Sequence, residues 1–232
     1  MPRKYIFLFL ILILHGTVNA SENIIINSID YLSSHPDSRY RISGLKRYKA
    51  RNFAEAFEDF HKAARYADKL SQASIAMMLW DGIGVRQNRT EAYAWMDLAA
   101  ERGYRQFVVL QKYYWQNLNE KERNTALQVS KEVFENYGDT VAKPRLESEL
   151  KKVMPATGTR LKGAAAGAGN SVRIHLKGPT TDITEYSVDS AEYYSPHYWD
   201  PKEYWSWVDT QYQKDLRPDV TIGPPVQMDQ KK

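Results

Sequence analysis

The sequence predicts an all-α protein, an α/α solenoid of stacked helix hairpins followed by a flexible linker and a small aromatic-rich C-terminal segment. The main observation is a pair of helices separated by a glycine loop, between Ser71 and Gly103. Apolar residues recur at amphipathic-helix spacing in both helices: the first has Ala73, Ala76, Met77 and Trp80, and the second has Ala92, Trp95, Met96, Ala99 and Ala100. Residues 81–85 are expected to form the loop, and Gly103 is expected to cap the second helix.

The second observation is an internal repeat. Asn52 precedes Asn88 by 36 positions, and four more residues recur at that offset: Ala56, Phe60, Ala63 and Ala64 precede Ala92, Met96, Ala99 and Ala100. Alanines at contact positions let neighbouring helices approach to about 8–10 Å. The sequence therefore predicts consecutive hairpins of the same kind.

These residues carry a resemblance to a known family. The order Ala73, 82–85, Asn88, Ala92, Trp95 and 99–103 resembles the Sel-one-like repeat, a relative of the tetratricopeptide repeat. The resemblance covers roughly residues 40–138. One repeat matches closely, the upstream copy matches in its second helix, and a third helix pair is expected at 104–117 and 120–137. The resemblance implies a helical-repeat fold that mediates protein–protein interaction.

The N-terminus has the features of a secretory signal peptide. Arg3 and Lys4 precede the apolar run 5–14, and Val18-Asn19-Ala20 is a small-residue cleavage pattern. The alternative is an uncleaved anchor, but the run is shorter than the roughly 20 residues a spanning helix needs. We expect cleavage after Ala20, export to the periplasm or the medium, and no transmembrane segment afterwards.

The overall composition excludes two kinds of chemistry. The net charge of +4 falls to +2 when Arg3 and Lys4 are removed, which gives no basis for nucleic-acid binding. The chain has no cysteine, so neither a disulfide nor a thiol nucleophile is available. Stability must come from packing.

Two helices are expected before the first repeat loop. Residues 21–34 carry Ile25, Ile29 and Leu32 on one face and are expected to cover the exposed end of the solenoid. Residues 38–49 form a strongly basic helix, which we interpret as a solvated face; the alternative is a patch for an anionic partner. The candidate partner-binding residues of this helix are Arg39, Arg41 and Arg47.

The aromatic residues of the repeats fall into two groups. Trp80 and Trp95 lie on the alanine stripes and are expected in the core. Phe57 and Tyr93 lie off the stripes at equivalent positions. They are candidates to line a peptide-binding groove, or to pack against the next repeat.

Prolines and glycines predict the domain boundaries. Pro144 is expected to interrupt a helical run and Pro155 to end the helix from Arg145, so the helical-repeat domain is expected to span 21–155. Residues 156–170 are expected to be a flexible Gly/Ala linker, because the stretch is small and nearly uncharged. The aromatic-rich C-terminal region would then be 171–232, mobile from about 221.

The C-terminal region is expected to contain a β-hairpin and one helix. Residues 171–177 alternate with period two and 183–188 follow a Gly-Pro turn. Asp200-Pro201 begins a helix, whose apolar stripe of Trp205, Val208, Tyr212 and Leu216 is expected to dock reversibly on the solenoid. Alternatively, Trp199, Trp205 and Trp207, with Tyr193 and Tyr198, provide faces for sugar rings or a partner.

The sequence contains no recognisable catalytic, cofactor or metal motif. His35, His61, His175 and His197 are dispersed, and Ser195 and His197 are separated only by a proline. We therefore expect a non-enzymatic scaffold that binds a protein or peptide and needs no cofactor or metal. The alternative is a cell-wall binder that recognises peptidoglycan or another glycan through its Tyr/Trp cluster.

Overall fold

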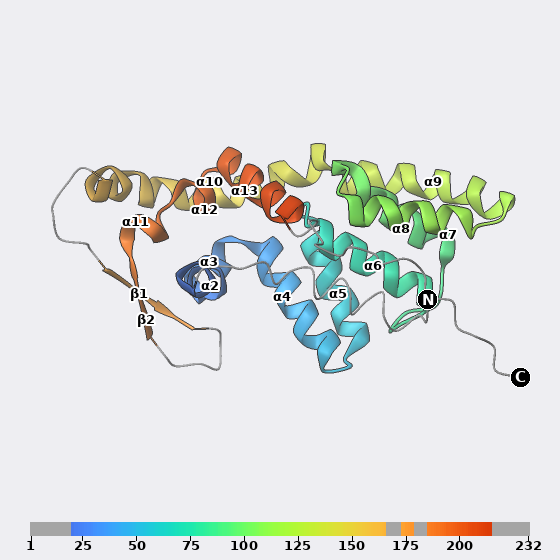
Figure 1. The fold of residues 1–232 in the computed structure, drawn as a ribbon, viewed down its shortest axis with the longest axis horizontal. Helices are drawn as coiled ribbons and strands as arrows, with labels where there is room; N and C mark the ends of the chain where they lie inside the picture. The colour runs from blue at the N-terminus through green and yellow to red at the C-terminus, as the bar shows by residue number, and fades with distance from the viewer. Residues whose placement is uncertain (1–19, 166–172, 179–184, 215–232) are drawn as a thin grey trace, which may run out of the picture.

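The computed structural model describes residues 20–165, 173–178 and 185–214. The fold is mostly helical, with packed helix pairs and one small two-stranded sheet. The helices of the first part are α2 Ala20–Asn27, α3 Ile29–Ser34, α4 Pro36–Lys49, α5 Phe53–Ala64, α6 Lys69–Asp81, α7 Arg89–Ala99, η1 Ala100–Arg102, α8 Arg105–Gln116, α9 Glu120–Tyr137 and α10 Asp139–Ala165. They are followed by β1 Arg173–Lys177, β2 Glu185–Asp189, α11 Ser190–Tyr193, α12 Pro196–Trp199 and α13 Pro201–Lys214. Figure 1 shows α9 and α10 running end to end along one side of the molecule.

The predicted helix pairs are present at the centre of the fold. Helix α4 packs on α5 and α6 packs on α7, and the alanines of both predicted stripes are buried between them. Trp80 and Trp95 are buried too, which confirms that they belong to the core. Gly82 and Gly103 end their helices with φ of 69° and 71°, in the left-handed region that glycine tolerates best.

One close approach was not expected from the sequence. Gly44 of α4 lies against Phe60 of α5, so near that a Cβ at position 44 would stand 2.7 Å from the Phe60 ring. Phe60 is fully buried, and its ring has no open side to which it can retreat. The absence of a side chain at Gly44 therefore sets how closely α4 and α5 pack.

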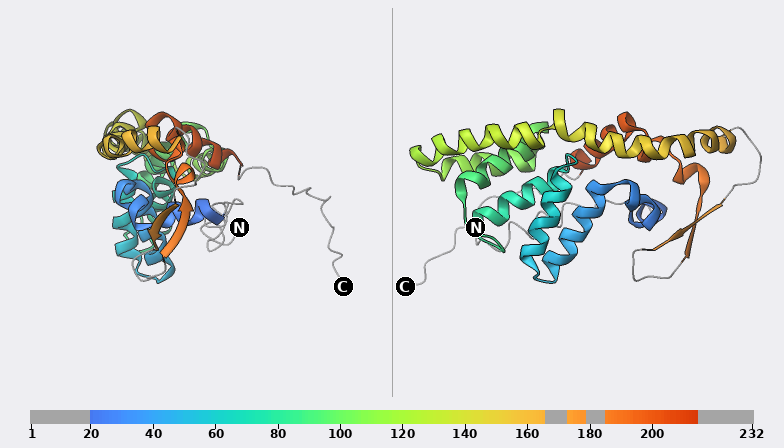
Figure 2. Two further views of the ribbon diagram at one scale, coloured as in Figure 1. Left: turned by 90° about the vertical axis from the view of Figure 1, so that its left-hand side faces the viewer. Right: turned by 180° about the vertical axis from the view of Figure 1, so that it is seen from behind.

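The third predicted helix pair forms, with a different packing. Helices α8 and α9 match the expected ranges, and Asn119 begins α9 with a capping box to Glu122. Both helices pack against α7. The α8–α9 end lies opposite the β-hairpin along the molecule (Figures 1 and 2).

The expected end of a helix at Pro155 is wrong. Helix α10 continues through Pro144 and Pro155 to Ala165, so residues 156–165 of the expected linker are helical and only 166–170 lie outside the described residues. An interior proline removes a hydrogen bond and costs about 3 kcal/mol or more. Burial of Ala142, Leu146 and Leu150 offsets this cost around Pro144. The strong helix formers that follow Pro155, such as arginine, leucine, lysine and alanine, favour continuation.

The N-terminal helix is broken, which also corrects its expected apolar face. Ser28 ends α2 and caps α3, since its hydroxyl accepts a hydrogen bond from the Tyr31 amide at 3.2 Å. The break rotates the second helix relative to the first. Ile29 is consequently 41% exposed, while Ile25 and Tyr31 are buried.

The N-terminal helices pack against the C-terminal region, and the two form a single hydrophobic cluster. The predicted β-hairpin is confirmed: β1 and β2 are antiparallel, with Ile174 opposite Val188. Its inward side chains join those of α2, α3, α11 and α12 in what we call the terminal cluster: Ile25, Tyr31, Leu176, Val188, Tyr193, Tyr198 and Trp199. The N-terminal helices are thus joined to the C-terminal region in a core separate from that of α4–α7, and the expected cover on the end of a solenoid stays a prediction.

The docking of the C-terminal helix is confirmed. Trp205 of α13 packs on α10 near Leu146 and Leu150, and Tyr212 stacks on Tyr104 with ring centroids 4.5 Å apart. The Tyr212 hydroxyl also accepts a hydrogen bond from the Leu70 amide at 3.2 Å. Leu216 of the expected stripe and the expected mobile tail from about 221 lie outside the described residues, as does the expected signal peptide up to residue 19.

Candidate binding pocket

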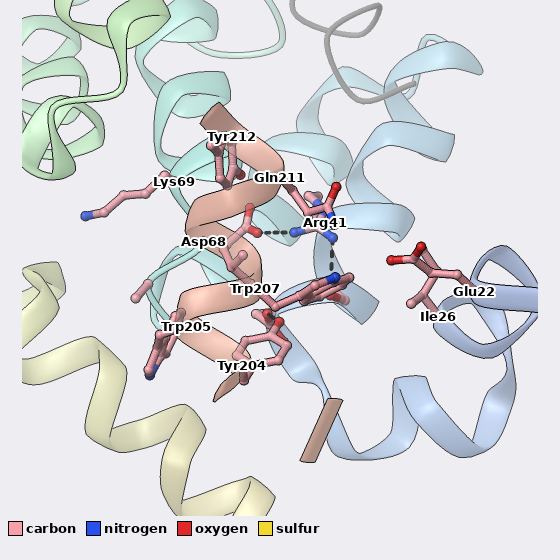
Figure 3. Close-up of a pocket in the computed structure, with 14 residues that line it drawn as sticks. Glu22, Ile26, Arg41, Asp68, Lys69, Tyr204, Trp205, Trp207, Gln211 and Tyr212 are labelled. Carbon is pink, nitrogen blue, oxygen red and sulfur yellow. Dashed lines mark hydrogen bonds and ion pairs between the residues drawn. The ribbon is translucent and has the colours of Figure 1, made fainter. Parts of the chain in front are cut away.

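A pocket of about 110 Å³ lies where α13 crosses the helix array. Helices α2 and α4 and the start of α6 form its other walls, and Figure 3 shows Glu22 and Ile26 of α2 facing Trp207 and Gln211 of α13. The pocket is lined by Glu22, Ile26, Asp37, Ser38, Arg41, Ala67, Asp68, Lys69, Tyr204, Trp205, Trp207, Val208, Gln211 and Tyr212. It combines carboxylates with aromatic and aliphatic side chains.

Arg41 is held on one wall by an ion pair with Asp68. The guanidinium also donates to the Ser38 hydroxyl at 3.2 Å, and the second oxygen of Asp68 caps α6 by accepting from the Ser71 amide at 2.8 Å. Burial is the largest single influence and would lower the pKa of Arg41. The acidic groups around it, Asp68 first and then Tyr212, Asp37 and Tyr204, together outweigh burial and raise that pKa above its ordinary value. Arg41 therefore stays charged and fixed.

Asp37 is the most deeply buried carboxylate of the pocket. The residue is only 3% exposed, and one of its carboxylate oxygens accepts a hydrogen bond from the Tyr204 hydroxyl. The other oxygen, Oδ1, has no hydrogen-bond partner among the described residues. Burial raises the pKa of Asp37, although the charges of His35 and Arg41 act in the opposite direction.

Lys69 borders the pocket but its charge is used elsewhere. Its fully buried ammonium bonds the Leu98 carbonyl at 3.1 Å, the Glu101 carboxylate at 2.6 Å and the Asp139 carboxylate at 3.0 Å. Figure 3 shows the Lys69 side chain extending away from Arg41 and Asp68. Lys69 therefore ties α6 to η1 and α10, and its charge is neutralised outside the pocket.

His35 connects the pocket wall to the terminal cluster. Its Nδ1 lies 2.9 Å from the Tyr31 carbonyl oxygen, and its Nε2 lies 2.7 Å from that of Tyr198. Burial lowers the pKa of His35, while Asp37 and the two carbonyls oppose that effect. This contact joins the α3–α4 corner to α12.

The predicted arginines do not form one open basic patch. Arg41 pairs with Asp68, and Arg47 reaches Asp59 at 3.3 Å. Arg39 is exposed and its guanidinium lies 4.8 Å from the centre of the Tyr40 ring. The structure brings only Arg41 into the pocket.

The predicted groove aromatics contribute to packing. Tyr93 is buried and contacts Trp115 with ring centroids 5.0 Å apart. Phe57 is half-buried, and its ring contacts His61 at 4.6 Å. Neither residue lines the pocket.

The three predicted tryptophans have different surroundings. Trp199 is buried in the terminal cluster, and its indole donates to the Tyr193 carbonyl at 2.6 Å. Trp205 is buried with Arg102 and Lys143 against its ring, and it donates to Glu147 at 3.1 Å. Trp207 alone of the three is half-buried at the pocket.

Sequence reasoning missed the acidic residues of the pocket. Asp37 follows a helix-starting proline and Asp68 precedes α6, so both have the sequence signal of a helix-start acid. That signal predicts a cap, but it does not predict that Tyr204, 167 positions from Asp37, will bond to it.

The residues that bear on other chemistry are few. Ser195 Oγ and His197 Nδ1 are hydrogen-bonded at 2.7 Å at the start of α12. Within the described ranges, no group of three or more His, Asp or Glu side chains is arranged to hold a metal ion. Among the same residues, no helix has both the length and the apolar character to cross a membrane.

No protein-family model, curated protein or solved structure matches this chain.

Proposed function

We propose that the protein is an exported, non-enzymatic scaffold whose α/α solenoid of Sel-one-like hairpins binds a protein or peptide partner. The observation that carries the proposal is the pocket between α13 and the helix array, which offers one partner side chain a partly apolar site. The packed pairs α4–α5 and α6–α7 support the repeat part of the proposal. Helical repeats of this kind present extended surfaces to polypeptide ligands.

The polar groups of the pocket favour binding over catalysis. Asp68 forms an ion pair with Arg41 and caps the start of α6, and one oxygen of Asp37 accepts a hydrogen bond from Tyr204. Such groups are held in place by structural partners. They suit the recognition of a charged group better than the transfer of a proton, which needs a group free to change its protonation state.

A carbohydrate-binding function receives less support from the geometry. Stacking on a sugar ring needs an aromatic face that is open to the ligand. Trp199 and Trp205 are covered by other parts of the protein, and Tyr193 and Tyr198 are buried with Trp199 in the terminal cluster. The cluster accounts for the folding of the C-terminal region.

Site-specific photocrosslinking in the producing organism tests the scaffold proposal. A photoreactive amino acid replaces Gln211, which lines the pocket, or Gln213, which is exposed on the same helix and does not. We expect a protein adduct from position 211 that is weaker or missing from position 213. If position 211 yields no protein adduct above the level of position 213, the pocket is not a contact site for a protein partner.

A further inference from the structure

The charges of the pocket are unbalanced once each residue's partner is counted. Its lining includes three carboxylates, those of Glu22, Asp37 and Asp68, and two basic groups, those of Arg41 and Lys69. Lys69 is neutralised by Glu101 and Asp139, and Arg41 by Asp68. Two carboxyl groups, those of Glu22 and Asp37, therefore line the pocket without an ion-pair partner among the described side chains that line it, and a cation beside Asp37 would favour its charged form, which burial disfavours.

The unpartnered oxygen of Asp37 is the second, independent observation. A buried acceptor without a donor costs about 1–3 kcal/mol, so Oδ1 has a strong preference for a hydrogen-bond donor. Arg41 donates to Asp68 and to Ser38, not to Oδ1, and the Tyr204 hydroxyl is engaged by the other Asp37 oxygen. A ligand that supplies N–H groups would satisfy Oδ1 and lower the charge imbalance together.

The other residues of the pocket wall favour an apolar chain next to the charged group of the ligand. Ile26, Val208 and the half-buried Trp207 supply apolar surface. The ring of Trp205, which also lines the pocket, already has Arg102 and Lys143 at 4.9 and 5.1 Å. At roughly 30 Å³ for each water-sized group, a volume of about 110 Å³ suits about four such groups, the size of a short alkylammonium.

We propose that the pocket binds an ammonium group on a short alkyl chain, as found in a lysine side chain or a free diamine. The ammonium donates to Asp37 Oδ1 and lies within the field of Glu22, while the methylene groups pack on Trp207 and Val208. The inference deepens the proposed function, because it names the chemistry of the partner group for that same pocket.

Isothermal titration calorimetry on the purified exported protein tests this inference. The probes are n-butylammonium, cadaverine and Nα-acetyl-lysine methylamide, with Nα-acetyl-norleucine methylamide as the uncharged analogue of the same length. We expect the ammonium compounds to bind at least tenfold more tightly than the norleucine compound. Tighter binding of the lysine compound than of cadaverine identifies a polypeptide as the source, and the reverse order identifies a free amine.

Three variants assign the binding to named residues. Asp37→Asn keeps the shape of the side chain and is expected to weaken ammonium binding at least tenfold. Glu22 is half-buried, so we expect the Glu22→Gln variant to fold and to weaken ammonium binding two- to threefold. Glu203 is exposed on α13 outside the pocket, and we expect Glu203→Gln to leave ammonium binding unchanged. Circular dichroism confirms that each variant is folded.

The results that overturn the inference differ from those that overturn the scaffold proposal. The cation site is eliminated if the norleucine and lysine compounds bind with equal affinity. It is also eliminated if no ammonium compound binds when added at 50 times the protein concentration or more. An unchanged affinity in both Asp37→Asn and Glu22→Gln eliminates it as well. Ammonium binding without a protein adduct from position 211 would retain the cation site and reject the protein partner.

Discussion

At the scale of single residues, Gly44 limits the separation of two helices. We predict that Gly44→Ala destabilises the protein by about 1–3 kcal/mol, because the new methyl group would stand 2.7 Å from the buried Phe60 ring. Alanine is intrinsically the better helix former by about 1 kcal/mol, so a loss of stability would be a packing effect. Urea unfolding measures it.

The matched control for this prediction is a double-mutant cycle. Phe60→Leu removes the edge of the ring that the methyl group would meet, at the expense of its own core packing. The free-energy losses of Gly44→Ala and Phe60→Leu should therefore sum to more than the loss of the double variant. Strict additivity would mean that the two side chains do not compete for the same space.

His61 gives the protein a dependence on pH that can be isolated. Burial among Phe57, Trp95 and Tyr137 lowers the pKa of His61 to about 4, below its unfolded value of 6.5. As pH falls, His61 therefore binds its proton in the unfolded chain before it does so in the folded protein. The contribution of His61 to the free energy of unfolding is fully present above pH 6.5 and is lost as the pH falls toward 4. From pH 7 to pH 5 we predict a loss of about 1–2 kcal/mol from this residue.

Thermal unfolding at pH 7 and pH 5 measures the contribution of His61 as a difference between variants. His61→Phe should lose less stability between the two pH values than the unmodified protein, and His175→Gln, exposed on β1, should behave as the unmodified protein does. Contributions from Asp37 and Asp97, whose pKa values burial raises, cancel in the comparison. Identical pH dependence in His61→Phe would exclude His61 as the cause.

Single-residue chemistry in the pocket was beyond sequence reasoning, for a physical reason. Local spacing predicts helix-start acids such as Asp68. The ion pair from Asp68 to Arg41, however, joins residues 27 positions apart, and the hydrogen bond from Tyr204 to Asp37 joins residues 167 positions apart. Periodicity within a helix cannot predict contacts between residues so far apart in the sequence. The burial of Trp80 and Trp95 was predictable because their own helices specify the inward face.

At the scale of the elements, the junction of α6, η1 and α10 contains a fully buried ammonium. We predict that Lys69→Met destabilises the protein by about 3 kcal/mol, because it leaves Glu101 without its cation and Asp139 with only Arg102 and Lys143. The matched control is Lys152→Met on α10, whose 2.8 Å ion pair with Glu149 is exposed and should be worth less than about 1 kcal/mol. Equal losses in guanidinium unfolding would contradict the central role of Lys69.

The docking of α13 can be tested at its Tyr212 contact. Tyr212→Phe removes the acceptor of the buried Leu70 amide and should cost about 1–2 kcal/mol, and Tyr212→Ala, which also removes the ring from Tyr104, should release the helix. Hydrogen exchange of the α13 amides reports the release. Gln213→Ala, at an exposed position, should leave exchange unchanged, and slow exchange in Tyr212→Ala would mean that other contacts hold α13.

Element boundaries were predictable where a local signal decides them. Gly82 and Gly103 end helices because they adopt a positive φ, and the alternation of residues 171–177 predicts β1 because one side of the hairpin is buried. The helix end predicted at Pro155 was wrong because the prediction considered only the local loss of a backbone hydrogen bond, and α10 continues in spite of that loss. The break at Ser28 went unpredicted because the capping hydroxyl lies within an otherwise periodic stretch.

At the scale of the whole molecule, the terminal cluster forms a second core beside the helix array. We predict that Leu176→Asp, which places a charge at a buried position of β1, disrupts the terminal cluster while the α4–α7 core remains folded. The result would be two unfolding transitions, the first accompanied by red-shifted tryptophan emission as Trp199 becomes exposed. His175→Asp, exposed on the same strand, is the control, and a single transition in Leu176→Asp would show that both cores unfold as one unit.

The contacts between the N-terminal helices and the C-terminal region also bear on the order of folding. His35 meets Tyr198 and Ser21 meets Glu192, contacts that span 163 and 171 positions. Contacts this distant in the chain close a long loop, and long-range closures of this kind are slow. We expect the burial of Ile25 and Tyr31 to come late in folding, because it requires the C-terminal residues of the terminal cluster.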